Sequence, residues 1–326
     1  MKILVTGATG KVGQHFIKRL LDDEGYSHAT VRALCHNRLL EPTDRLEVVS
    51  GSIADRSVVT GAVAGVTHLL HLATCKETPE DVMDVTVKGM FWLLEACRLS
   101  EEFERFILIG GDAAMGHFVY PHPVPVTETQ KHSAYEGCYA LSKVLEEVML
   151  EQYFVQYGLD GCCLRAPWIM EKDDFKYSMS FGEDVFGGPR WCELVGDAQA
   201  RRHQESGAVP VMLDPDSQPV QRNFVHVEDL VSAILLALEH PKARQELFNI
   251  CMDEPVHYAK VAEHLARTHG LPSVEVPTPF RSTWLDNAKA KFLLGWRPRY
   301  DMARLVDESY AYHRAPEDPR EIWYPG

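Results

Sequence analysis

Short apolar runs alternate with longer amphipathic stretches along the first half of the chain. Each run is rich in Val, Ile and Leu, which predicts a buried strand, and the stretches between them repeat their apolar residues with the spacing of a helix. This alternation predicts a doubly wound α/β domain, a parallel sheet with helices on both faces. The predicted strands are residues 2–6, 30–35, 46–49, 67–72, 105–109 and 161–165, and the predicted helices are residues 11–23, 79–99 and 135–157.

The alternation stops after Pro167, where a long irregular stretch covers residues 171–222. Helical spacing returns near 191–205 and again at 227–239, 258–269, 286–293 and 302–312, with one short strand at 247–250. A parallel sheet followed by such mixed structure predicts a second, smaller domain laid over the edge of the first. We therefore expect a first domain at residues 1–166 with a returning segment at about 223–250, and a second domain at 167–222 and 251–326.

Composition and charge exclude several classes of protein. The chain has 326 residues and a net charge of −14, which opposes binding to nucleic acid or anionic lipid. No apolar run reaches the roughly 18–20 residues of a membrane span, and no signal-peptide pattern precedes the first strand, so we expect a cytoplasmic protein. The eight cysteines and fifteen histidines lack the spacing of disulfide or metal sites. They predict buried thiols and no bound metal.

A glycine-rich turn joins the first predicted strand to the first predicted helix. Glycines at 7, 10 and 13 permit a tight turn and the close approach of a diphosphate, toward which the first amides of the helix would point. The spacing Gly-x-x-Gly-x-x-Gly departs from the commoner Gly-x-Gly-x-x-Gly. The turn predicts a dinucleotide site that includes Gly7, Thr9, Gly10, Lys11, Val12 and Gly13.

The end of the second predicted strand bears on the choice of nicotinamide cofactor. Enzymes that use NAD place a carboxylate there to bind the ribose hydroxyls, whereas Cys35 holds the position in this chain. His36, Arg38 or Arg32 could instead bind a 2′-phosphate. We therefore expect NAD(P) with a slight preference for NADP. The alternative is that these cations are surface groups and that the backbone holds the ribose.

Tyr139 and Lys143 are the candidate catalytic pair. Residues four apart lie on one face of a helix, so this phenol and this ammonium would point into the same pocket. A tyrosine ordinarily titrates at about pH 10, and a nearby cation favours its phenolate. The pair therefore predicts a general base that works near neutrality.

The order of several motifs resembles the extended short-chain dehydrogenase/reductase family, in its NAD-dependent epimerase/dehydratase group. The matching segments follow the family's order from residue 3 to about residue 310. They are the glycine turn at 7–13, His-Leu-Ala at 71–73, Val-Lys-Gly at 87–89, Leu-Leu-Glu-Ala at 93–96, Tyr-Ala-Leu-Ser-Lys at 139–143, Leu-Arg-Ala-Pro at 164–167, residues 222–229, and Leu-Gly-Trp-Arg-Pro at 294–298.

The resemblance implies a nicotinamide cofactor along the edge of the sheet and a substrate held by the second domain. Tyr139 would exchange a proton with a carbinol or carbonyl of the substrate. Lys143 would hold the nicotinamide ribose and lower the pKa of the tyrosine. The remaining implied cofactor contacts are Ser52, Ile53, Leu72, Ala73, Thr74 and the backbone at Pro167.

Gly111 departs from the family pattern. The family places Ser or Thr there to hydrogen-bond the reacting oxygen, and losing such a donor typically costs about 100- to 1,000-fold in rate. Three explanations stay open: space for a bulkier substrate, a neighbouring donor such as Thr74, Asp112 or a substrate hydroxyl, or a dinucleotide-binding protein with little chemistry. Asp112 and Ala113 are predicted substrate contacts. Ala113 stands where the dehydratases have Glu, which disfavours a 4,6-dehydratase.

Trp168 and Arg222 complete the predicted substrate contacts. Trp168 replaces the family Asn that binds nucleotide sugars, and its indole could instead stack on a sugar or another ring. Arg222 matches the family arginine that often meets a substrate phosphate, with an ion pair to an acid such as Asp229 as the alternative. The nearby aromatic residues either line the pocket or belong to the core; they are Phe175, Tyr177, Phe181, Phe186 and Trp191.

These features predict an NAD(P)-dependent oxidoreductase that transfers hydride at a secondary alcohol or ketone of a sugar or sugar-derived metabolite. Two alternatives stay open: an epimerase that retains its cofactor, and a dinucleotide-binding regulatory protein with little turnover. By resemblance we expect a homodimer that forms through helices 79–99 and 135–157, and a small-molecule substrate.

Overall fold

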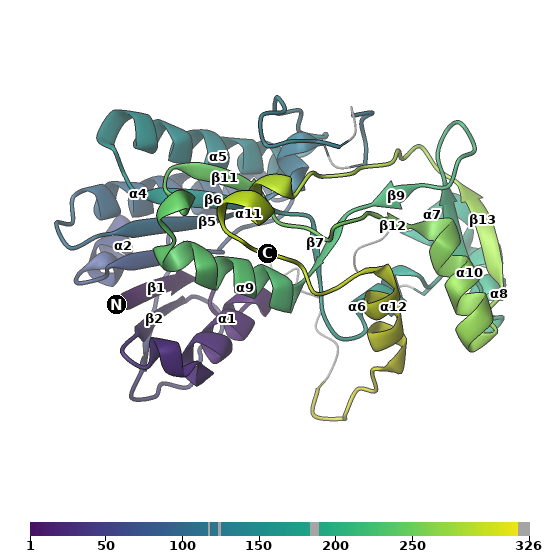
Figure 1. The fold of residues 1–326 in the computed structure, drawn as a ribbon, viewed down its shortest axis with the longest axis horizontal. Helices are drawn as coiled ribbons and strands as arrows, with labels where there is room; N and C mark the ends of the chain where they lie inside the picture. Colours follow the sequence, from purple (N-terminus) through teal and green to yellow (C-terminus); the bar gives the residue numbers. More distant parts are fainter. Residues whose placement is uncertain (117, 123–124, 183–188, 319–326) are drawn as a thin grey trace.

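A seven-stranded parallel sheet forms the centre of the first half of the molecule (Figure 1). The computed structural model describes residues 1–116, 118–122, 125–182 and 189–318. In spatial order the strands are β11 (Glu246–Asn249), β6 (Gly161–Ala166), β5 (Arg105–Gly111), β4 (His68–His71), β1 (Lys2–Thr6), β2 (Thr30–Cys35) and β3 (Leu46–Ser50). Every adjacent pair is parallel, so the predicted doubly wound sheet is confirmed.

Helices cover both faces of the sheet because its strands are apolar on both sides. One face carries α1 (Lys11–Asp22) and α9 (Val227–Glu239), whose apolar residues share a core with β1, β2 and β5. The other carries α2 (Arg56–Val63), α4 (Met90–Arg98) and α5 (Cys138–Tyr157). The predicted helix 79–99 is formed by α3 (Pro79–Asp81), a π-helix, η2 (Val82–Gly89), and α4.

A second core lies beyond β6 and is built from short elements (Figure 1). Its strand pairs are β7 (Trp168–Met170) with β10 (Phe224–His226), β8 (Val209–Leu213) with β13 (Ser273–Pro277), and β9 (Gln221–Arg222) with β12 (Val256–His257). Its helices are α6 (Asp174–Ser178), α7 (Trp191–Val195), α8 (Asp197–Glu205), α10 (Tyr258–His269) and α12 (Met302–Ala311).

The chain returns twice from the second core to the first. After β10 it forms α9 and β11, and later α11 (Ala288–Leu293) packs near β11 while Trp296 enters the first core. The predicted domain limits assign residues 251–326 to the second domain and do not include this later return. The limits themselves stay a prediction.

One prediction for the second half was wrong. The single helix expected at 191–205 is divided into α7 and α8, because Gly196 adopts a φ of 82° that interrupts the helical backbone. The stretch 171–222 also contains two strands for which no prediction was made, β8 and β9. Each is a short strand whose partner is distant in sequence, so local periodicity carries little signal.

The carboxyl ends of the central strands bring the predicted cofactor residues to one edge. Gly7 follows β1, Cys35 ends β2, Leu72 follows β4, Gly111 ends β5 and Pro167 follows β6. In open parallel sheets ligands bind at this edge, where the strand order reverses. Among the described residues, no helix combines the length and apolarity that crossing a membrane requires.

Candidate active site

The glycine turn packs directly on the chain that follows β4. Gly7 has a φ of 67°, and a Cβ at this position would lie 2.8 Å from the amide nitrogen of Ala73. A Cβ on Gly13 would lie 2.6 Å from the carbonyl oxygens of Gly7 and Ala8. Both contacts are too short for a side chain, so only glycine permits this turn. The glycines therefore hold the turn tightly between the end of β1, the chain after β4 and the start of α1.

Lys11 points away from the turn and into the second half of the molecule. Its side chain is 8% exposed, and its ammonium donates to the carbonyl of Ile169 at 3.0 Å and forms an ion pair with Asp174. The neighbouring Val12 belongs to the apolar core. Lys11 was predicted to contact the cofactor. In the structure its side chain instead joins the glycine turn to β7 and α6.

The cations near the end of β2 differ in their surroundings. His36 and Arg38 are exposed beside the buried thiol of Cys35. Arg32, in contrast, donates to the carbonyls of Ala62 and Ala64 at 2.7 and 2.8 Å. Arg32 also contacts Glu47 at 3.0 Å. Its guanidinium thus binds the end of α2, whereas His36 and Arg38 are exposed after the end of β2.

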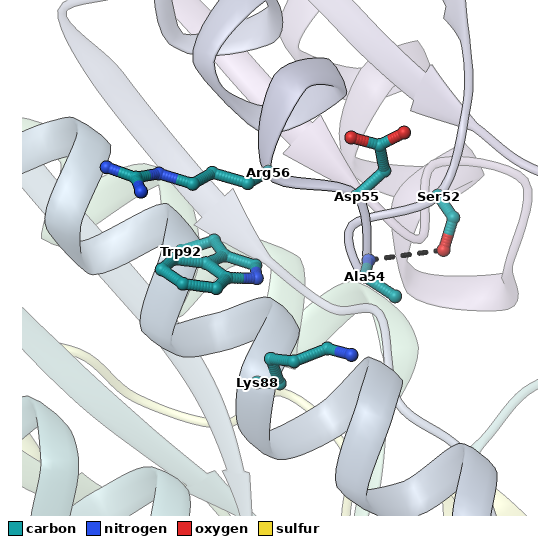
Figure 2. A pocket seen from close by; sticks show the side chains of 6 residues that line it. All are labelled: Ser52, Ala54, Asp55, Arg56, Lys88 and Trp92. Atoms are coloured by element: carbon teal, nitrogen blue, oxygen red, sulfur yellow. Dashed lines mark hydrogen bonds between the residues drawn. The ribbon is translucent and has the colours of Figure 1, made fainter.

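An open hollow of about 550 Å³ lies beside Ser52 (Figure 2). The Ser52 hydroxyl accepts the amide of Ala54 at 3.2 Å, and Ile53 turns inward to pack on Gly89. Figure 2 shows Lys88 and Trp92 on one helix facing the segment 52–56 across the hollow. The predicted cofactor residue Ser52 therefore borders space that a flat ring could occupy.

Tyr139 lies in the first turn of α5, which Glu77 caps from outside the helix. The carboxylate of Glu77 accepts the amide of Tyr139 and the thiol of Cys138, both at 3.3 Å. An acid at a helix N-terminus is favoured by the free amides and the helix dipole. A Cβ on Gly137 would lie 2.8 Å from that carboxylate, and Gly137 has a φ of 135°. Glycine before the helix thus admits the cap that fixes Tyr139.

Two ammonium groups flank the ring of Tyr139. Nζ of Lys76 lies 3.7 Å from the ring centroid and Nζ of Lys143 lies 5.7 Å from it. Burial, followed by the charge of Lys143, lowers the pKa of Lys76 to about 8, while Glu77 and Asp112 oppose the change. Cations over a tyrosine stabilise its ring and favour the phenolate. A second lysine, Lys76, therefore lies beside Tyr139 in addition to the predicted Lys143.

Lys143 is buried, and its ammonium contacts an acid. It is 5% exposed, and Nζ lies 2.8 Å from Oε2 of Glu146, one turn further along α5. Its aliphatic part faces the end of β5, since a Cβ on Gly111 would lie 3.8 Å from Cγ and Cδ of Lys143. Lys143 thus lies between Gly111, where the family pattern has Ser or Thr, and the buried carboxylate of Glu146.

Gly111 leaves room for a small side chain. Its backbone is extended, with φ −139° and ψ 147°, and the nearest atoms to a Cβ lie at ordinary contact distances. Asp112 and Ala113 are buried in the short helix η3 (Asp112–Met115) that follows. The hydroxyl of Thr74, a candidate substitute donor, contacts the carbonyl of Cys75 at 3.4 Å. Serine at 111 would therefore fit without displacing the backbone.

Trp168 and Arg222, predicted from separate motifs, lie together. The Arg222 guanidinium carbon is 3.9 Å from the ring centroids of both Trp168 and Phe118, and Arg222 is 3% exposed. Asp229, the alternative partner suggested by sequence, instead accepts the amides of Arg299 and Tyr300 at 3.0 Å. Arg222 is therefore covered by aromatic rings.

The other aromatic residues of 171–222 pack mainly in the second core. Phe175, Phe181 and Trp191 are buried there, and the Trp191 indole donates to the carbonyl of Ser178 at 3.2 Å. Tyr177 is half-buried, and Phe186 lies outside the described residues. Trp168, just before this stretch, meets Phe118 edge to face, and Phe118 in turn meets Phe280 edge to face.

Sequence reasoning missed Lys76, Glu77 and Glu146. Glu146 had a usable signal, because a residue three places after a predicted catalytic lysine shares its helix face. Lys76 and Glu77 had none, since only the fold brings the loop after β4 to the start of α5. No group of His, Cys, Asp and Glu in the described part of the chain could hold a metal ion.

The chain is similar in sequence and in fold to known proteins along almost its whole length. A UDP-glucose 4-epimerase from Lactobacillus helveticus is 21% identical, over 97% of this chain and 98% of the relative. A putative anthocyanidin reductase from Ginkgo biloba is 23% identical, over 95% of this chain and 93% of the relative. Among solved structures, a short-chain dehydrogenase/reductase superfamily protein from Agrobacterium tumefaciens with bound NAD has a TM-score of 0.78 at 25% identity. That match covers 95% of this chain and 96% of the other.

The family profile described as GDP-mannose 4,6 dehydratase matches residues 4–309, almost the whole chain. The two relatives are named as an epimerase and a putative reductase, and the solved structure holds NAD. The resemblance inferred from the motifs is confirmed. The chain belongs to the extended short-chain dehydrogenase/reductase family, as an enzyme of its NAD-dependent epimerase/dehydratase group.

Proposed function

We propose that this enzyme transfers hydride at a secondary alcohol or ketone of a sugar or sugar-derived metabolite. The observation that carries the proposal is the position of Tyr139. Its ring lies 3.7 and 5.7 Å from two ammonium groups, on a helix that begins near the carboxyl edge of the sheet. A phenol among cations at a dinucleotide edge suits proton exchange with a carbinol.

The residues divide the work as follows. Tyr139 takes the proton of the substrate hydroxyl at its phenolic oxygen during oxidation and returns it during reduction. Lys143 and Lys76 stabilise, by their positive charge, the phenolate form of Tyr139 that accepts this proton. When bound, the nicotinamide would supply the hydride acceptor or donor. Lys143 would also hydrogen-bond the ribose of that cofactor.

The turn and the strand edge fit a dinucleotide. Gly7 and Gly13 let the turn pack tightly on the chain after β4 and on itself at the start of α1, where the first amides of a helix favour an anion. The hollow beside Ser52 would take the adenosine end. A slight preference for NADP is part of the proposal, since β2 ends in a thiol and is followed by His36 and Arg38. Isothermal titration calorimetry with NAD and with NADP would show which cofactor binds more tightly.

The substrate is expected to be a sugar or a comparable ring. Trp168, which is only half-buried and lies beside Arg222, is the ring on which such a substrate would stack. Ala113 supplies no carboxylate beside Asp112, so a 4,6-dehydratase is not favoured despite the name of the matching family.

A nucleotide-sugar epimerase is the second candidate, favoured by the UDP-glucose 4-epimerase among the relatives. An epimerase keeps its cofactor through the cycle, whereas a net dehydrogenase releases it. Cofactor that remains with the protein through purification and gel filtration would favour the epimerase. Tight cofactor binding without turnover on any substrate would favour the regulatory alternative.

A homodimer is also proposed. Exposed apolar residues lie on the neighbouring helices η2, α4 and α5; they are Met83, Phe91, Leu141, Val148 and Val155. Covering them with a second copy would bury a surface that is unfavourable in water. Sedimentation equilibrium would measure the oligomeric state.

Tyr139→Phe tests the central assignment. The variant keeps the ring between the two lysines but cannot exchange a proton, so turnover should fall by about 100- to 10,000-fold. The assay is cofactor reduction or oxidation with a panel of sugars, nucleotide sugars and polyols, alongside epimer formation from UDP-glucose. Tyr157→Phe, an exposed tyrosine at the other end of α5, is the matched control. Undiminished turnover in Tyr139→Phe would disprove the mechanism.

A further inference from the structure

Glu146 is a fully buried acid one turn after Lys143. Its exposure is 0%, and its Oε2 lies 2.8 Å from Nζ of Lys143. Its other oxygen, Oε1, lies 3.8 Å from Nε2 of His71 on β4. Within the part of the chain that the structure describes, neither oxygen of Glu146 nor that nitrogen has a hydrogen-bond partner, so the contact with Lys143 is an ion pair.

His71 is held in one tautomer by Thr6. The Thr6 hydroxyl accepts the amides of Leu72 and Ala73 at 3.2 and 3.3 Å, so its hydrogen is left for Nδ1 of His71 at 2.7 Å. Burial, with the charge of Lys143, lowers the pKa of His71 to about 3, so the ring is neutral. The hydrogen-bond network therefore assigns the ring hydrogen to Nε2, on the side of Glu146.

An acid at this position is unfavourable for packing alone. Removing a carboxylate from water is costly unless its oxygens are fully bonded, and a leucine would fill the same space without that cost. Burial accordingly raises the pKa of Glu146, while Lys143 opposes the rise and the neighbouring Glu147 adds to it. The thiol of Cys163, on β6, also interacts electrostatically with Glu146. Among these groups Lys143 is the cation that compensates the acid.

We propose that Glu146 is a positioning residue for the proposed hydride transfer: it holds the Lys143 ammonium in place and offsets part of its charge at Tyr139. The inference rests on the proposed function, because it concerns the same tyrosine. The carboxylate also lies 3.8 Å from His71, whose other nitrogen is hydrogen-bonded to Thr6, and Thr6 in turn accepts the amides of Leu72 and Ala73.

This pairing changes which lysine acts more strongly on Tyr139. A carboxylate 2.8 Å from an ammonium cancels much of the field that the ammonium exerts at a distance. Lys143, 5.7 Å from the ring, then acts as one half of a nearly neutral pair. Lys76, at 3.7 Å, has the larger effect on the phenolate.

The test is a direct titration of Tyr139 by its tyrosinate absorbance. The chain has 12 tyrosines, so subtracting the spectrum of Tyr139→Phe isolates this one. The measurement is made on the full chain alone and again with NAD⁺, and it needs no substrate. Glu146→Gln keeps the shape but removes the charge, and should lower the midpoint of Tyr139 by about one pH unit. Glu151→Gln, an exposed acid on the same helix, should leave it unchanged.

Glu146→Asp guards against a folding defect in the Gln variant. It keeps the negative charge with a shorter reach, so its midpoint should lie between those of the unaltered chain and Glu146→Gln. An unchanged or raised midpoint in folded Glu146→Gln would overturn the inference. If Tyr139→Phe retains full turnover, the proposed function fails instead, whatever the titration shows.

Discussion

Two adjacent glutamates on α5 are both buried, yet their surroundings differ. Glu147 faces β6, where Arg165 donates to both of its oxygens at 3.0 and 2.7 Å and His132 contacts it at 2.8 Å. Glu146 faces His71 on β4; it forms an ion pair with Lys143, and neither of its oxygens has a hydrogen bond to any described residue. The same helix therefore has one side on which the buried carboxylate is fully hydrogen-bonded, the saturated side, and one on which it is not, the unsaturated side.

The pKa values follow this difference. Burial raises the pKa of Glu147, but hydrogen bonds from His132 and Arg165 outweigh it and hold the pKa below its usual range. Burial raises the pKa of Glu146, and Lys143 does not fully reverse the rise. A satisfied buried ion pair fixes the helix to the sheet, whereas an unsatisfied one is available to adjust a neighbouring charge.

The largest effect is expected from breaking the saturated side. Arg165→Met leaves Glu147 buried without its bidentate partner, which should destabilise the fold by about 3–5 kcal/mol. Urea denaturation of the full chain measures the loss. Glu146→Gln should cost less than half as much, because its carboxylate has fewer bonds to lose. Equal costs would remove the distinction between the two sides.

An intermediate effect is expected from Lys76→Met. Losing a desolvated cation over the ring should lower kcat at saturating cofactor by about 5- to 30-fold, equivalent to about 1–2 kcal/mol. Because the pKa of Lys76 is about 8, its charge is present below that pH and is lost above it. The ratio of wild-type to variant activity should therefore be largest below pH 8 and shrink above it.

Lys76→Arg serves as the control for this prediction. Arginine stays charged above pH 8, so the variant should retain the benefit where the wild-type lysine loses it. A defect that appears only as weaker cofactor binding, with kcat unchanged, would contradict an effect on Tyr139.

The smallest effect is expected from restoring the absent hydroxyl. Gly111→Ser fits the extended backbone and ordinary contact distances, so stability should change by no more than about 0.5 kcal/mol. Since two ammonium groups already surround Tyr139, kcat should change by less than about threefold. In the Lys76→Met background the same substitution should recover part of the lost activity. A large gain in the unaltered chain would show that the site lacks a donor.

The central sheet could be predicted from sequence because its strands are continuous apolar runs. The runs at 2–6, 30–35 and 161–165 match β1, β2 and β6 to within one residue. Burial on both faces demands such composition, and the helices between them keep a clear period. The small strand pairs β8–β13 and β9–β12 join segments distant in sequence, so no local pattern marks them.

The candidate site was predictable where a motif places residues at fixed spacing. Tyr139 and Lys143 share a helix face, and the glycine turn precedes a helix, so neither needs long-range information. Lys76 reaches Tyr139 from the loop after β4, and Glu146 becomes informative only once its burial against His71 is known. Contacts across elements decide these two roles, and sequence order does not encode them.

The burial of Lys11 has a consequence for how the halves of such a protein can be recombined. Its ammonium is neutralised by Asp174 and bonded to Ile169, both beyond the predicted domain boundary at 166. A chimaera that joined this glycine turn to a foreign second half would bury that charge without a counterion. The two halves are therefore matched parts, and exchange between relatives must carry residues 11, 169 and 174 together.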